Sequence, residues 1–243
     1  MKIGQEMVEG FAWGQAAKLA SDPFKNIDAA IEASNSEALD ALKKEIGALL
    51  EAEGKGIALF KSVDSIFDQY AAFEELREYM IDLCVVKLLQ ELEEGEEDEE
   101  QDALDSPEWE KIEAAAEDRG TELLNALIYI KDCRLNETEP GMEDFLYNFL
   151  LAGEDDFQEE MAIYEPFVRQ IDLVDAPLKQ LIEAGNDQRD YDLADLFTPM
   201  LLFFRDPIAK QGKITLNILE FSAEPALHCA LHNLLIGFNS AEI

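Results

Sequence analysis

The sequence predicts an all-α protein of roughly ten helices, arranged as an irregular multi-helix bundle with no substantial sheet. Apolar residues recur at steps of three to four along most of the chain, which is the spacing of one helical face. Several of these stretches follow an Asp-Pro, Ser-Pro or Glu-Pro pair, as a helix follows a capping residue and a first-turn proline. Only residues 213–221 alternate like a strand. A single strand has no partner, so we interpret them as an irregular segment or the start of a helix.

The N-terminal helical part is expected to span residues 1–92. Its predicted helices cover residues 1–20, 22–31, 36–54, 57–70 and 71–90. The last two either run together or bend near Ala71, because neither Pro nor Gly occurs between Ile57 and Glu94. Residues 71–90 are apolar over more than one stripe, which predicts a helix covered by neighbours on several sides.

Gly10 and Gly14 have the four-residue spacing of membrane-helix dimers. That interpretation requires an apolar span of about 20 residues, and the longest apolar run, Met200 to Phe204, is far shorter. The pair therefore predicts a close contact with a neighbouring helix of the same fold.

The composition changes abruptly after this buried helix. Nine carboxylates and no basic residue occur between Glu91 and Asp102. Like charges repel and bury little surface, so we expect residues 93–105 to be a solvated acidic connecting loop. This loop would join residues 1–92 to a C-terminal helical part, residues 106–243, as two units or as one continuous domain.

The C-terminal part contains six further apolar stretches of helical spacing. They cover residues 106–134, 142–153, 157–174, 177–185, 191–204 and 224–238. Residues 191–204 are apolar nearly all round and are interrupted by Thr198-Pro199. We interpret them as a central buried helix, the alternative being a groove for a partner.

The formal net charge of −35 on 243 residues limits the possible partners. Such a charge excludes nucleic acid and anionic membrane as direct partners, because both are themselves negative. It favours encounter with a basic protein, although solubility or adaptation to salt would explain it too. The acidic residues predicted to meet such a partner are Glu93, Glu94, Glu96, Glu97, Asp98, Glu99 and Glu100.

The three cysteines, Cys84, Cys133 and Cys229, are widely spaced within apolar patterns and form no Cys-x-x-Cys motif. We expect buried free thiols in a reducing compartment. The first residues also lack the continuous apolar core of a signal peptide. The expected location is the cytoplasm.

His228 and His232 are the best candidates for metal-dependent chemistry. Their spacing places both imidazoles on one helical face, from which they could reach one metal with a carboxylate such as Glu224. However, Cys229 stands where a zinc protease has its general-base Glu, and both histidines are expected at the edge of a leucine-rich core face. We therefore expect no metal and no other cofactor.

No reaction is specified by the sequence, since it contains neither a phosphate-binding glycine loop nor a nucleophile elbow. The prediction is an acidic cytoplasmic protein-binding module that neutralises or adapts a basic protein, as an inhibitor or immunity protein does. The alternative is a metal-assisted enzyme that uses His228, His232 and a nearby carboxylate.

Overall fold

The computed structural model describes residues 3–19, 37–52, 56–95, 106–116, 119–150, 163–188, 193–208 and 213–240. Within these ranges every regular element is a helix, which confirms the all-α prediction. The predicted helix over residues 22–31 lies outside the described residues.

The first half of the sequence forms α-helices that are followed by a 3₁₀ helix and a long last α-helix. They are α1 (Ile3–Leu19), α3 (Glu37–Glu51), α4 (Ala58–Phe67), the 3₁₀ helix η1 (Ala71–Leu76) and α5 (Arg77–Gly95). The pattern from Ile57 onward therefore bends at Ala71, as one of the two predicted alternatives. A 3₁₀ turn at this place changes the chain direction without a proline or glycine.

The second half is divided into shorter pieces. They are α6 (Pro107–Ala116), α7 (Leu123–Leu135), α8 (Met142–Asp144), the π-helix η3 (Phe145–Phe149), α10 (Glu165–Arg169), the 3₁₀ helix η4 (Ile171–Asp175), α11 (Leu178–Asn186), α12 (Ala194–Arg205), α13 (Lys213–Phe221) and α14 (Pro225–Ser240). The prolines at the starts of α6 and α14 occupy the first helical position, as their sequence context predicted.

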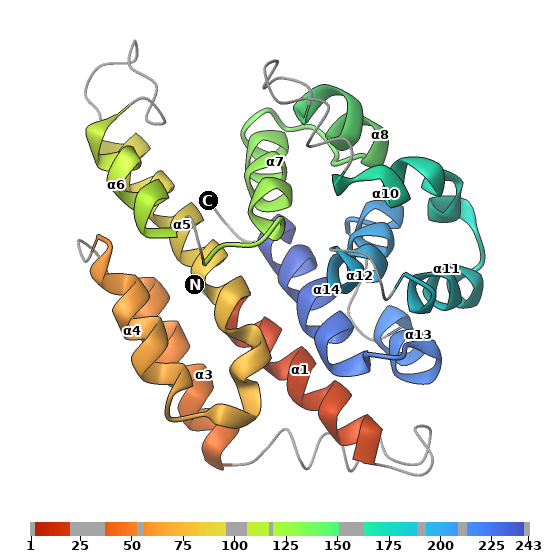
Figure 1. Cartoon of the computed structure of the whole chain (residues 1–243), viewed down its shortest axis with the longest axis horizontal. Coiled ribbons are helices and arrows are strands. Elements are labelled where there is room, and N and C mark those ends of the chain that lie inside the picture. Colours follow the sequence, from red (N-terminus) through yellow and green to blue (C-terminus); the bar gives the residue numbers. More distant parts are fainter. Residues whose placement is uncertain are drawn as a thin grey trace.

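Helix α14 forms the centre of the molecule. Every residue from Pro225 to Phe238 is buried, as expected for a helix without a polar face. Figure 1 shows α14 in blue between α1, α7, α12 and α13, all of which contact it. The core thus combines elements from both halves of the sequence.

The contact between α1 and α14 is exceptionally close. A Cβ atom at Gly14 would lie 2.1 Å from the Cα of Ala226, and one at Gly10 would lie 2.6 Å from the carbonyl oxygen of Cys229. Only glycine permits such approach of two backbones. The close helix contact predicted for this glycine pair is confirmed.

Helix α12 is the second buried element, and each of its residues from Leu196 to Phe204 is buried. This result confirms the central-helix interpretation over the partner groove. The predicted interruption is wrong, because Pro199 lies inside the continuous helix. Proline has no backbone N–H to donate within the helix, yet the buried helix α12 continues through Pro199.

Two further predictions are corrected. Residues 106–134 do not form one helix, since α6 ends at Ala116 and α7 begins at Leu123. Residues 213–221 form the regular helix α13, which agrees with the predicted start of a helix and not with the alternative of an irregular segment. The acidic loop also begins later than residue 93, because α5 continues through Gly95.

Candidate functional site

Two adjoining hollows form one groove between the two halves of the sequence. Their volumes are about 540 and 720 Å³, and they share Glu78, Tyr79 and Asp195. Helices α5 and α6 with the start of α7 contribute to it, as do α11, α12 and the start of α14. We call the two hollows together the acidic groove.

Carboxylates dominate the lining of the acidic groove. All are exposed except one, which is half-buried at the start of α7. The seven are Glu74, Glu75, Glu78, Glu113, Glu122, Asp195 and Glu224. Among the described lining residues the one lysine or arginine is Arg77.

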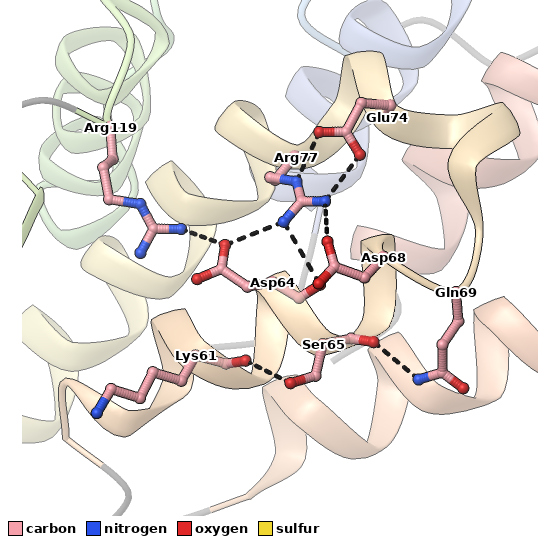
Figure 2. A network of polar contacts seen from close by, with 8 residues as sticks. All are labelled: Lys61, Asp64, Ser65, Asp68, Gln69, Glu74, Arg77 and Arg119. Atoms are coloured by element: carbon pink, nitrogen blue, oxygen red, sulfur yellow. Dashed lines mark hydrogen bonds and ion pairs between the residues drawn. The ribbon is translucent and has the colours of Figure 1, made fainter.

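The positive charge of Arg77 is already paired within the protein. Its guanidinium donates to both carboxylate oxygens of Glu74, at 2.7 and 2.8 Å, and to Asp68 at 2.7 Å. A further ion pair joins it to Asp64 at 3.2 Å, and Figure 2 shows all three acids converging on it. These hydrogen bonds, that of Glu74 foremost, raise the pKa of Arg77. The groove therefore keeps a net negative field.

The segment before α7 closes one wall of the groove. Arg119 forms an ion pair with Asp64 at 2.6 Å, as Figure 2 shows, and its guanidinium lies 5.8 Å from the ring centre of Phe60. Thr121 is held by Asp82 of α5, through bonds of 2.9 Å to its N–H and 2.6 Å to its hydroxyl. These tertiary bonds explain why the predicted helix over residues 106–134 is interrupted here.

Tyr79 and Asp195 meet where the two hollows join. The buried Tyr79 hydroxyl donates to Asp195 across 3.4 Å. Burial, and then the charge of Asp195, raise the pKa of Tyr79, which stays a neutral donor. Partial burial raises the pKa of Asp195, and the nearby Glu224 carboxylate adds to the effect. A cation placed between these acids would relieve their repulsion.

The predicted partner-binding residues lie elsewhere. Glu93 and Glu94 are in the last turn of α5, and Glu93 pairs at 2.5 Å with Lys131, whose side chain is 7% exposed. Glu93 thus joins α5 to α7 through this ion pair, although both Glu93 and Glu94 are exposed. Glu96, Glu97, Asp98, Glu99 and Glu100 lie outside the described residues.

Both histidines are buried, and for His232 the predicted position at the edge of the core is wrong. His228 lines the acidic groove, and its Nδ1 lies 2.7 Å from the hydroxyl of Ser222. Neither ring nitrogen of His232 has a hydrogen-bond partner in the described part of the chain. Complete burial lowers the pKa of His232 to about 4.

Across the residues that the structure describes, no three His, Cys, Asp or Glu side chains come together in a way that could hold an ion. Cys84, Cys133 and Cys229 are free and buried, as predicted. Burial raises the pKa of the Cys84 thiol to about 12, which leaves it unreactive near neutral pH.

Sequence reasoning missed the acidic groove because its residues range from position 74 to position 224. No local signal marked it. Glu74 and Glu78 lie four residues apart, but they belong to η1 and α5, and Glu74 is paired with Arg77.

Comparison with protein-family models, with curated proteins and with solved structures gives no match. None of the helices among the described residues is long and apolar enough to cross a membrane. Function therefore has to be inferred from the groove itself.

Proposed function

We propose that the protein is a binding module for a basic segment of another protein, which it holds in the acidic groove and thereby neutralises. The lining of the groove supports this proposal, because seven carboxylates surround it and the positive charge of Arg77 is already paired. A concave site of one charge sign concentrates the field and attracts the opposite charge. Lysine and arginine side chains are the protein groups that fit it.

The groove is better suited than a flat acidic surface to retain a partner. Exposed charges act over about 8–10 Å in physiological salt, enough to guide an encounter but too weakly to hold a complex. In the groove, partial desolvation raises the pKa of Asp195. A partly desolvated carboxylate is less screened by water, which strengthens its contact with a cationic side chain.

The acidic residues after α5 would have a supporting role. Glu94 and the run from Glu96 to Glu100 would steer a basic partner toward the protein, whereas Glu93 is engaged with Lys131. An inhibitor or immunity-like protein that covers a basic surface in the cytoplasm would use both parts. The three buried free thiols are compatible with that reducing compartment.

Binding of a deca-lysine peptide tests the proposal. The double variant Glu78→Gln/Asp195→Asn should weaken the affinity about tenfold, since two carboxylates shared by both hollows are lost, and one of them, Asp195, is partly desolvated. The matched control Glu137→Gln/Glu139→Gln removes two charges from the exposed loop after α7. It should change the affinity less than about twofold because of screening. Equal losses in the two variants would show that net charge, and not the groove, binds the peptide.

A further inference from the structure

Glu122 differs from other carboxylates of the acidic groove because uncharged donors hold it in place. It lies directly before α7 and lines the hollow of about 540 Å³. The hydroxyl of Tyr164 and the side-chain amide of Asn125 both donate to its Oε2, each at 2.9 Å. No ion pair joins Glu122 to another described residue. The two hydrogen bonds therefore fix the carboxylate and leave its negative charge in place.

The groups that hold Glu122 are themselves fixed. Tyr164 is fully buried, and its ring packs edge-on against Phe145 with 5.6 Å between the ring centres. Its hydroxyl also lies 3.3 Å from the backbone carbonyl oxygen of Glu122. Asn125 follows three residues later, so it lies on the same face of the helix. A side chain that is positioned before binding loses little entropy when a partner arrives.

Other carboxylates of the acidic groove lack this combination of fixed position and available charge. Glu74 is paired with Arg77, and Asp195 accepts a long hydrogen bond of 3.4 Å. Glu113 is exposed, and no side-chain hydrogen bond joins it to another described residue. Compared with these three acids, Glu122 is the better prepared to hold a cationic side chain.

The two carboxylate oxygens of Glu122 are not equivalent. A carboxylate oxygen has two lone pairs, and Tyr164 and Asn125 occupy both of those on Oε2. Oε1 accepts no side-chain hydrogen bond from another described residue. A guanidinium binds a carboxylate best through both oxygens, whereas an ammonium is a point charge that needs only one. The occupied Oε2 therefore removes the usual advantage of arginine.

The rest of the hollow also suits a lysine. The amide nitrogen of Asn125 is engaged with Glu122, which leaves its carbonyl oxygen as a second acceptor beside the same hollow. An ammonium has three donors that rotate freely, so it can bond to both acceptors. Trp109, Leu124 and Leu196 line the hollow as well. Such apolar surface can cover the four-carbon stem of a lysine.

We propose that Glu122 is the specificity-determining residue of the acidic groove, where it holds a lysine of the partner in preference to an arginine. This inference rests on the proposed function, because it concerns the same groove. Seven carboxylates attract both kinds of cation, and the fixed carboxylate discriminates between them. Tyr164 and Asn125 act through Glu122 and are positioning residues.

The affinities of deca-lysine and deca-arginine, measured at one physiological salt concentration, test the proposal. Their ratio is the readout, because attraction by the net charge acts on both peptides. Glu122→Gln keeps an oxygen for Tyr164 and Asn125 but places an amide donor where Oε1 was. It should weaken deca-lysine binding about tenfold and lower the preference for lysine about threefold. The matched control Glu113→Gln, in the same hollow, should change either affinity less than about twofold and keep the ratio.

Tyr164→Phe tests the positioning without changing any charge. It opens one lone pair of Oε2 to a guanidinium, so the preference for lysine should fall about threefold while the deca-arginine affinity stays within about twofold. A merely structural role of Tyr164 would lower both affinities equally and would overturn its assignment as a positioning residue. Should Tyr164→Phe fail to fold, Asn125→Ala opens the same oxygen from a half-buried position and should lower the ratio likewise.

The outcomes separate this inference from the proposed function. Equal ratios in the wild type and in Glu122→Gln would overturn the inference. The proposed function would then still stand if Glu78→Gln/Asp195→Asn weakens deca-lysine binding. Absence of binding of both peptides to the wild type would overturn the proposed function and the inference together.

Discussion

His232 on α14 and Asp82 on α5 are both buried titratable side chains, but their surroundings differ. His232 is enclosed by the packed core and neither ring nitrogen has a partner in the described residues. Asp82 accepts two hydrogen bonds from a segment that borders the acidic groove. Burial lowers the pKa of His232 to about 4 and raises that of Asp82 to about 7.

The difference shows how one physical effect can produce either an inert or a responsive group. Desolvation disfavours the charged form of both side chains. For the histidine it fixes the neutral form at physiological pH. For the aspartate it brings the titration into the physiological range, next to the surface where a partner would bind. Burial thus keeps His232 neutral, whereas at the α5–α7 junction it makes the charge of Asp82 depend on pH near neutrality.

The largest effect should come from the packed region. Gly14→Ala places a methyl group 2.1 Å from the Cα of Ala226, and backbone atoms cannot yield as a flexible side chain does. We expect a loss of about 5 kcal/mol in the free energy of unfolding, measured with urea. Gly141→Ala is the control, because its Cβ would meet only Asp144 at 4.0 Å. Equal small losses would show that α1 and α14 are less tightly joined.

Asp82→Asn should give the next largest effect. Because its folded-state pKa is raised to about 7, Asp82 binds a proton in the folded state where the unfolded chain does not. The stability of the wild type should therefore fall as the pH rises from about 4 to about 7, by about 4 kcal/mol from this group. Asp82→Asn should remove this slope and be the more stable protein at pH 8. A variant that is less stable than the wild type at pH 8 would contradict a net cost of the buried charge.

His232 should give the wild type the opposite slope, with a slightly smaller size, and His232→Leu should remove it. The folded-state pKa is lowered to about 4, so the unfolded chain takes up the proton first as the pH falls. The wild type should lose about 3 kcal/mol between pH 6.5 and pH 4 from this group. In His232→Leu that contribution should vanish. The unfolding free energy, compared at both pH values, decides this prediction. Persistence of the full loss would place its origin in other groups.

Glu93→Gln should have the smallest effect of the four. It leaves Lys131, whose side chain is 7% exposed, without its charged partner, and should cost about 1 kcal/mol because the pair is partly screened by solvent. Glu94→Gln, one residue later on the exposed side, should be neutral within about 0.5 kcal/mol. Thermal unfolding of both variants provides the comparison. Identical effects in the two variants would show that the pair with Lys131 adds no stability, and that Glu93 behaves like the rest of the solvated acidic run.

The sequence was sufficient where a residue's environment depends on its own helix. Apolar spacing predicted the burial of α12, and Ser106-Pro107 predicted the start of α6, where the Ser106 hydroxyl accepts the N–H of Trp109 at 3.1 Å. It failed where another element decides. The buried position of His232 depends on helices packed around α14, and the break before α7 depends on Asp82 and Asp64.

The acidic groove could not be predicted for the same reason. Its carboxylates are ordinary exposed acids in their own helices, and only the fold brings Glu78 and Asp195 together. In a chain with 54 acidic residues, no local pattern distinguishes these from the others. The acidic run after α5 is recognisable in the sequence because its residues are contiguous. The residues of a binding site need only be close in space.

The packing of α1 against α14 has a consequence for the synthesis of the protein on the ribosome. Asn233 donates to the carbonyl oxygen of Glu6, a residue 227 positions earlier. At about 5–20 residues per second, α1 waits roughly 10 to 45 seconds for its packing partner to be synthesised. During that interval the part of α1 that packs on α14, with Gly10 and Gly14, stays uncovered. The dense negative charge of the growing chain would keep such molecules apart until the core can close.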